Sequence, residues 1–370
     1  MQQSLENSPL ISILLPTHNR ADVLPFAIQS VLAQTIQDFE LLIVGDGCTD
    51  NTAEIVQSFS DPRIQWHDLP KAPGFGYANR NIVLRLARGE FIAYMAHDDL
   101  WLSDHLEQLL PFFSDEKIEI VYSRPLWVIP FGMIVPGMFN LDHAPTLKIF
   151  LNKESNLIPA GFFIHRRECF FKYGYWNDNL PAAGDQDMWV RIIKGGREKN
   201  FVYVGCPTCL HFKANWRDES YDTAFGFNYW RRLFAAGQMP FSLKVEVKDG
   251  VSEQEAVWEA MLSDPQRWAK QIRIASQQVL DRRAFEGNYM FEYLLSFHGD
   301  RLGTPISFHP IWGFDMPVLL DELLRNETDV IRKTLTWRIR ERFINNSIFR
   351  FFHSLLISPL RKVFTQSRKK

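Results

Sequence analysis

The chain has 370 residues, of which 46% are hydrophobic and 23% are charged. This composition excludes wholesale disorder, a collagen-like repeat and a small disulfide-bonded scaffold. The length predicts two or three domains. The sequence contains no uninterrupted apolar run of transmembrane length, so we do not expect a polytopic membrane protein. Four cysteines and an N-terminus without a signal-like segment favour a cytoplasmic location.

The formal net charge of -2 is unevenly distributed. Residues 331–370 contain eleven basic residues and one acidic residue, a net charge of +10, which leaves -12 for residues 1–330. Five apolar residues of this tail share one face of a predicted helix: Ile344, Ile348, Phe351, Phe352 and Leu355. Such a helix either contacts an anionic membrane surface, at the inner face of the plasma membrane, or packs on the acidic body. We recognise no nucleic-acid-binding module and expect no nucleic acid partner.

Strand and helix patterns alternate over the first 100 residues. Apolar runs predict strands at 11–15, 39–44, 64–67 and 91–95, and helical spacing predicts helices at 21–33, 50–59 and 77–87. Repeated units of this kind predict an α/β fold with a mostly parallel sheet flanked by helices. Ligands of such sheets bind beyond the carboxyl ends of the strands. Three of these ends carry polar segments, at 17–20, 46–50 and 97–99.

The pattern is less regular beyond residue 100. Strands are expected at 118–128 and 161–165, and part of a helix at 188–193. Residues 125–145 are rich in proline, glycine and aromatic residues and are expected to form an irregular lid or loop. From about residue 222 the pattern is helical. We therefore predict a first domain over 1–235, a helical extension over 236–330 and the basic amphipathic tail over 331–370.

Five short segments together carry a recognisable pattern. In chain order they are SILLPTHNR at 12–20, VGDGCTD at 44–50, Arg80-Asn81, GEFIAYMAHDDLW at 89–101 and GDQDMWVR at 184–191. In composition and order they resemble family 2 of the glycosyltransferases, whose members have the GT-A fold. The resemblance implies that the first domain transfers a sugar from a nucleotide-sugar donor to an acceptor hydroxyl, with inversion at the anomeric carbon.

The resemblance also implies a divalent metal ion, Mn²⁺ or Mg²⁺, which would neutralise charge on the diphosphate leaving group. Asp98 and Asp99 lie where the family has its metal-binding Asp-x-Asp-Asp segment, and His211 lies where many members carry a histidine near the metal. Ala96 replaces the leading carboxylate, which in the family contacts the donor ribose, and His97 is a substitute for part of that contact. The alternatives are that the two aspartates cap the following helix and that His211 is an ordinary half-buried residue.

A general base is needed because a free hydroxyl is a weak nucleophile. Asp185 matches the catalytic aspartate of the family. Gly184 replaces a glutamate of the family pattern, so we expect looser contacts with the acceptor there. Asp187 is either an alternative base or a residue that orients Asp185. Asp185 can also cap its helix, and this is compatible with catalysis.

Six residues match positions at which the family holds the nucleotide: Thr17, Asn19, Arg20, Asp46, Asp50 and Arg80. Among them, Asp46 matches the acid that reads the base, and it would accept a hydrogen bond from uracil N3–H. The fixed charge and forked donors of Arg80 suit a base or a phosphate. The alternative is that these residues are loop charges or Asx-turn residues.

We therefore expect an inverting, metal-dependent glycosyltransferase that uses a UDP-sugar and a carbohydrate or lipid-linked acceptor in the synthesis of cell-surface polysaccharide or glycolipid. Two alternatives stay open. A nucleotidyltransferase would carry a glycine-rich phosphate loop after its first strand, where this chain has Pro16–Asn19. A non-catalytic nucleotide-sugar binder or scaffold would explain Ala96 and Gly184, but the presence of Asp98 and Asp185 favours an enzyme.

Overall fold

The computed structural model describes residues 8–137, 140–142, 144–153, 158–213 and 227–286. The described residues as far as Asp281 belong to one compact unit. The tail at 331–370 and its predicted amphipathic helix lie outside the described residues, as does the predicted extension beyond residue 286. None of the helices in the described ranges combines the length and the apolar character that a membrane crossing requires.

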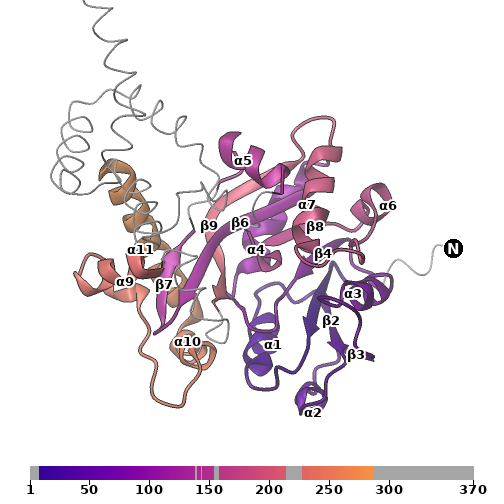
Figure 1. The fold of residues 1–370 in the computed structure, drawn as a ribbon, viewed down its shortest axis with the longest axis horizontal. Helices are drawn as coiled ribbons and strands as arrows, with labels where there is room; N and C mark the ends of the chain where they lie inside the picture. Colours follow the sequence, from indigo (N-terminus) through magenta and orange to yellow (C-terminus); the bar gives the residue numbers. More distant parts are fainter. Residues whose placement is uncertain (1–7, 138–139, 143, 154–157, 214–226, 287–370) are drawn as a thin grey trace, which may run out of the picture. The chain divides into compact units, whose positions relative to one another are not determined.

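Within the described residues, nine strands form one sheet (Figure 1). The hydrogen-bonded order is β3-β2-β1-β4-β8-β6-β9-β5, and β7 pairs with β6. Its first half is parallel and consists of β1 (Ile11–Thr17), β2 (Phe39–Asp46), β3 (Ile64–Leu69) and β4 (Phe91–Tyr94). The predicted α/β fold is therefore confirmed. β2 is buried along its whole length, as a parallel strand covered on both faces should be.

The second half of the sheet is mixed. β6 (Ile120–Ile129) runs parallel to β9 (Phe201–Phe212). In contrast, β5 (Leu100–Trp101), β7 (Met133–Pro136) and β8 (Phe163–Arg166) run antiparallel to the strands they pair with. β5 and β9 were not among the predicted strands.

The segment predicted to be an irregular lid instead contains the end of β6 and all of β7, which form a hairpin. Pro125 lies at a break in the register between β6 and β9, and Pro136 is the last residue of β7. Proline is tolerated at such positions because its missing N–H does not interrupt a regular ladder. The proline-rich composition therefore marked strand irregularities rather than a loop.

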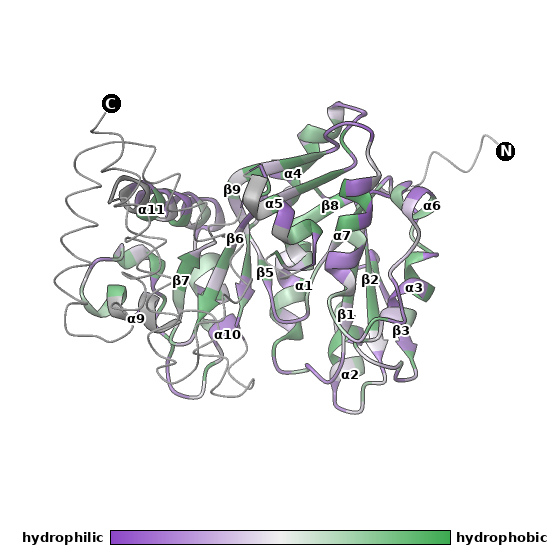
Figure 2. Cartoon of the chain, turned by 45° about the horizontal axis from the view of Figure 1, so that its top comes forward, coloured by the Kyte–Doolittle hydropathy of each residue, from purple (hydrophilic) through white to green (hydrophobic). Residues whose placement is uncertain are grey.

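Helices connect and cover the strands, and hydrophobic residues gather along the strands between them (Figure 2). The α-helices are α1 (Leu24–Leu32), α2 (Thr52–Gln57), α3 (Tyr77–Leu84), α4 (His105–Leu109), α5 (Ala144–Leu151), α6 (Cys169–Tyr173), α7 (Gly184–Gly195), α9 (Phe227–Ala235), α10 (Glu253–Leu262) and α11 (Pro265–Glu286). Short 3-10 turns lie at Leu110–Ser114, Ala160–Phe162 and Phe241–Leu243. The described part of the extension is thus helical, as the sequence predicts.

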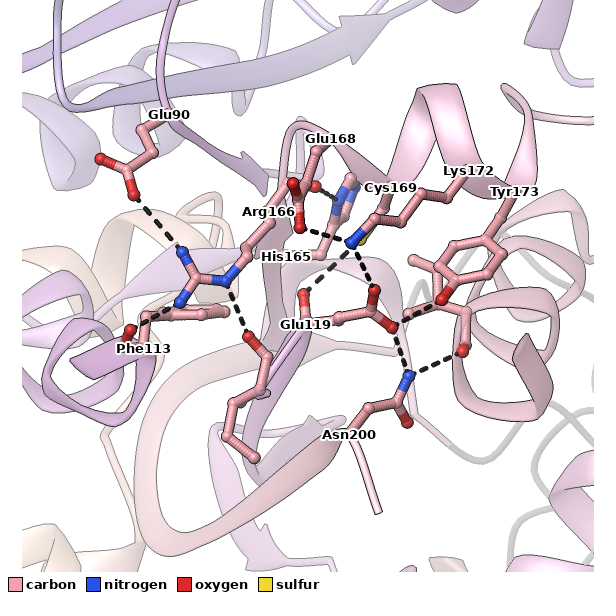
Figure 3. A network of polar contacts seen from close by, with 12 residues as sticks. Glu90, Phe113, Glu119, His165, Arg166, Glu168, Cys169, Lys172, Tyr173 and Asn200 are labelled. Carbon is pink, nitrogen blue, oxygen red and sulfur yellow. Dashed lines mark hydrogen bonds and ion pairs between the residues drawn. The ribbon is translucent and has the colours of Figure 1, made fainter. Parts of the chain in front are cut away.

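A buried polar network joins the amino ends of β6 and β9 to α6 (Figure 3). The Glu119 carboxylate accepts hydrogen bonds from Lys172 Nζ at 3.0 Å, Tyr173 Oη at 2.7 Å and Asn200 Nδ2 at 2.6 Å. Desolvation raises the pKa of Glu119, but these donors outweigh it and the net shift is downward. The network lies at the edge of the sheet opposite to the predicted ligand-binding ends, so its role is to hold the strands together.

Candidate active site

The polar strand ends meet at one edge of the parallel sheet, as predicted. Thr17 is the last residue of β1 and Asp46 is the last residue of β2, and the register pairs Thr17 with Gly45. Asp98 and Asp99 follow β4, which pairs with β1 on its other side. The candidate donor-binding and metal-binding residues therefore occupy adjacent loops.

Asn19 and Asp50 hold two of these loops together. Thr49 N donates to Asn19 Oδ1 at 2.7 Å, and Asn19 itself adopts a positive φ of 51°. Asp50 accepts from Ala21 N at 3.2 Å and from Thr52 N at 3.1 Å, next to the start of α2. These contacts are of the loop and Asx-turn kind, which the sequence left open as the alternative to nucleotide binding. Direct nucleotide contacts from the two residues remain a prediction.

The Asp46 carboxylate is buried and already bound by the chain. It accepts from Ala72 N at 2.8 Å and from Asn79 Nδ2 at 2.6 Å, and it forms an ion pair with Lys71. A Cβ atom at Gly76, whose φ is 72°, would lie 2.5 Å from Asp46 Oδ2, so this turn requires glycine. Asp46 thus anchors the segment that leads into α3, and base recognition by it remains a prediction.

Sequence reasoning missed both side chains that hold Asp46. Asn79 stands beside Arg80 in a matched segment, so its position could have suggested a role. No sequence pattern marks Lys71, which reaches Asp46 from the loop after β3.

Arg80, a candidate nucleotide-binding residue, lies over two aromatic rings. Its guanidinium carbon lies 5.1 Å from the ring centroid of Tyr77 and 5.0 Å from that of Trp176. Burial lowers the pKa of Arg80, whereas Tyr77 and the carboxylates of Asp185 and Asp46 oppose this shift. Arg80 stays charged, because an arginine pKa begins above 12. A fixed cation therefore lies within electrostatic reach of both Asp46 and Asp185.

Asp185 lies in the first turn of α7, which follows Ala183 in a left-handed conformation with φ of 54°. Its Oδ1 accepts from Gln186 N at 2.8 Å. The neighbouring Gly184 N donates to the Tyr77 hydroxyl at 3.0 Å, and a Cβ atom at Gly184 would lie 2.8 Å from the Tyr77 ring. The tyrosine ring thus occupies the space into which a family-type glutamate would project.

Asp187 forms ion pairs with two basic side chains. It is 6% exposed, forms an ion pair with Lys153, and accepts from Arg191 Nε at 2.9 Å. Desolvation raises the pKa of Asp187, but hydrogen bonds from the two cations outweigh it and lower the pKa overall. A carboxylate held in this way is a weak base. The sequence left two roles open for Asp187, an alternative base or a residue that orients Asp185, and these contacts favour the second.

The three candidate metal ligands do not have equal surroundings. Asp99 is fully buried, and both of its carboxylate oxygens lie 2.9 Å from His211 Nδ1. Phe212 N also donates to Asp99 Oδ1 at 3.1 Å. Burial raises the pKa of Asp99, and these donors oppose the shift. Asp98 is more exposed, at 17% of its side chain, and its Oδ1 lies 3.9 Å from His97 Nε2.

The residues fit a divalent cation only together with a phosphate ligand. No three or more histidine, cysteine, aspartate or glutamate side chains form a ready metal cluster within the described ranges. However, Mg²⁺-type cations commonly take one or two protein carboxylates together with substrate phosphates. Because Asp99 accepts from Nδ1–H of His211, the Nε2 atom of that ring keeps its lone pair for a cation. Asp98 and His211 would then be the protein ligands, and Asp99 would orient His211.

Three buried polar atoms at this site have no hydrogen-bond partner among the described residues: Thr17 Oγ1, Arg80 Nε and His97 Nδ1. Burial lowers the pKa of His97, and the charges of Arg20 and Arg80 act in the same direction, whereas Asp98 opposes them. Unpaired buried polar groups are rare in native proteins. A polar ligand bound at this site would provide these atoms with partners.

The sequence of the chain matches a known protein family. The model of the family described as Glycosyl transferase family 2 matches residues 12–169. The chain is 30% identical over 235 residues to the UDP-Glc:alpha-D-GlcNAc-diphosphoundecaprenol beta-1,3-glucosyltransferase WfaP of Escherichia coli, covering 60% of this chain and 90% of WfaP. The chain belongs to glycosyltransferase family 2. The predicted family and the predicted enzyme class are therefore confirmed.

The chain spans only about a third of the length of several other relatives that it matches. An uncharacterized glycosyltransferase of Rickettsia felis is 28% identical over 200 residues, and the match spans 50% of this chain but 32% of that relative. Among solved structures, residues 1–349 of S. aureus TarS in complex with UDP-GlcNAc align with a TM-score of 0.48 and 17% identity, over 78% of this chain and 81% of TarS 1–349.

Proposed function

We propose that this family 2 chain is an inverting glycosyltransferase that moves a sugar from a UDP-sugar to an acceptor hydroxyl with the help of Mn²⁺ or Mg²⁺. The observation that carries the proposal is the meeting of three groups at one sheet edge. Asp185 supplies a carboxylate, Arg80 supplies a fixed cation that interacts with it, and Asp98, Asp99 and His211 supply an acidic and imidazole cluster.

The donor end of the site is built to receive negative charge. Arg20 and Arg80 both lie within electrostatic reach of His97, which is held at the side of Asp98. A divalent cation bound at Asp98 and His211 would neutralise the charge that develops on the diphosphate. Thr17, with its unpaired buried hydroxyl, and Arg20 would complete the contacts to the nucleotide.

Asp185 is the proposed general base. Its carboxylate would take the proton of the acceptor hydroxyl as the hydroxyl oxygen bonds to the anomeric carbon and the bond from that carbon to the diphosphate breaks. Attack from the side opposite to the leaving group inverts the anomeric carbon. Asp187 lies in the same turn of α7 as Asp185 and forms ion pairs with Lys153 and Arg191. It would hold Asp185 in position.

The activity for which WfaP is named supports the proposed substrate classes. That relative uses UDP-glucose and an acceptor linked to diphosphoundecaprenol. By extension, we propose a UDP-sugar donor and a carbohydrate or lipid-linked acceptor in polysaccharide or glycolipid synthesis. A lipid-linked acceptor would give the basic tail at 331–370 a reason to contact an anionic membrane surface. Flotation with anionic liposomes, comparing the full chain with one that ends before Ile331, tests that contact.

The decisive experiment measures nucleoside diphosphate release. The full chain is incubated with Mn²⁺, a panel of UDP- and other nucleotide-sugars, and candidate lipid-linked acceptors, with EDTA as the metal control. We expect acceptor-dependent release of UDP with one donor, and loss of release in EDTA. Donor binding without release under any condition would instead favour the non-catalytic binder, and release that EDTA leaves unchanged would remove the metal from the proposal.

A further inference from the structure

The helical extension reaches the active site through a buried glutamine. Gln254, in the first turn of α10, is 8% exposed, and its Nε2 donates to the backbone oxygen of Asp98 at 3.2 Å. The rest of the buried face of α10 is largely apolar, with Val257 and Met261 almost fully enclosed. An apolar side chain at 254 would fill the same space, so packing alone does not call for an amide there.

A second contact holds the other end of the same loop. Arg273 of α11 donates from Nη1 and Nη2 to the two carboxylate oxygens of Asp104, at 2.7 Å and 2.6 Å. Its Nε also donates to the backbone oxygen of Pro207 in β9, at 2.9 Å. Desolvation raises the pKa of Asp104, but the contacts with Arg273 outweigh it and lower the pKa. Forked contacts of this kind fix orientation as well as distance.

The two contacts lie at the two ends of the loop that carries Asp98, one of the two residues proposed to hold the cation. The loop from Asp98 to Asp104 carries Asp99 and β5, and β5 pairs with β9 through Leu100 and Leu210. Both Gln254 and Arg273 lie outside the part of the chain that the family model matches. The extension therefore contacts both ends of the segment that carries Asp98 and Asp99, and Asp99 pairs with His211.

From these contacts we infer that the extension contributes to the active site by positioning the loop 98–104, and that Gln254 is a positioning residue for Asp98. This inference rests on the proposed function, since it concerns the loop that would bind the cation and the donor diphosphate. The amide holds the backbone of Asp98, so the carboxylate of Asp98 is presented at a fixed place. Arg273 fixes the far end of the loop and its pairing with β9.

The test compares Gln254→Met with Gln277→Met in the full chain. Methionine keeps the volume and helix preference of glutamine but cannot donate to the Asp98 oxygen. Gln277 is exposed on α11 and bonds only within its own helix, to Asp281, among the contacts described, so it is a matched control. UDP binding in the presence of Mn²⁺ is measured by calorimetry, and backbone hydrogen exchange is followed in peptides that span residues 98–104.

We expect Gln254→Met to weaken UDP–Mn²⁺ binding about 3- to 10-fold, as the loss of one hydrogen bond would, and to speed exchange at 98–104. Gln277→Met should match the wild type in both. If Gln254→Met does not fold, Arg273→Lys, which loses the fork but keeps the charge, should produce the same two changes. Unchanged affinity or unchanged exchange in the folded variant overturns the inference while the proposed function stands. A wild type that binds no UDP with Mn²⁺ overturns the proposed function and this inference together.

Discussion

His211 Nδ1 lies 2.9 Å from both carboxylate oxygens of Asp99, although 112 residues separate the two in the sequence. The pair joins the loop after β4 to β9, and it fixes which nitrogen of the imidazole carries the proton. A carboxylate that orients a histidine in this way is a common feature around metal ligands. Asp99, which is fully buried, is therefore better suited to orient His211 than to bind a cation itself.

Replacing Asp99 with asparagine should weaken metal binding without removing a ligand. Asparagine has nearly the same shape but no charge, so His211 would lose its fixed tautomer. We expect Mn²⁺ affinity in the presence of UDP to fall about 10- to 100-fold, measured by calorimetric titration. Asp142→Asn is the control, since Asp142 is exposed and pairs with Lys199. An affinity for Asp99→Asn equal to that of the control would contradict the orienting role.

Asp185→Asn should remove the general base while leaving the donor in place. We expect kcat to fall about 10²- to 10⁴-fold, because an amide cannot take the proton of the acceptor hydroxyl. UDP binding should stay close to that of the wild type. The measurement is UDP release at saturating donor and acceptor, alongside calorimetry with UDP and Mn²⁺. A variant that retains most of its turnover would assign the base to another residue.

Gly184→Ala should destabilise the fold, because the added Cβ would lie 2.8 Å from the Tyr77 ring. Overpacking of this kind costs about 1–3 kcal/mol in the free energy of unfolding, which urea denaturation can measure. Gly205→Ala is the matched control, since a Cβ there meets nothing within 4 Å.

The double variant Gly184→Ala/Tyr77→Leu tests the cause of that loss. With the ring removed, the alanine has room, so the two effects should be less than additive. Strict additivity would mean that Tyr77 is not what requires glycine at 184.

Two buried histidines should make the protein less stable in mild acid. His165 donates from Nδ1 to Arg166 O, and its Nε2 accepts from the Tyr94 hydroxyl, both at 2.8 Å, so the ring is fully paired as the neutral form. Burial lowers the pKa of His165 to about 4 and that of His105 to about 3, from an ordinary value of 6.5. Between these values the unfolded chain takes up protons that the folded chain does not.

The free energy of unfolding should therefore fall as the pH drops below about 6.5, by about 2 kcal/mol per histidine at pH 5. Urea denaturation at a series of pH values measures this slope. His165→Gln should lower stability at neutral pH but flatten the slope by about one proton, because it removes a group that the unfolded chain protonates and the folded chain does not. An unchanged slope in His165→Gln would mean that His165 is already protonated in the folded protein.

The sequence predicted the first half of the sheet because its strands and helices are local patterns. A short apolar run such as Leu41–Val44 indicates a buried strand, and the polar segment that begins at Asp46 marks the ligand-binding edge. Short motifs such as 97–99, in one loop, and 184–191, in one helix, are likewise local, which is why the family and its candidate residues could be predicted.

Only the tertiary structure decided how these residues act on one another. β5 has two residues and exists because it pairs with β9, so no local pattern could have predicted it. Three contacts join residues that are far apart in the chain. They are the pair of Asp99 and His211, the packing of Tyr77 against Gly184, and the hydrogen bond from Gln254 to Asp98. Such contacts depend on strand order and helix packing, which the whole fold sets. The uneven distribution of charge is a property of the sequence alone. Some of the acidic residues of the body lie at the sheet edge, and the net charge of +10 belongs to residues 331–370, outside the described residues.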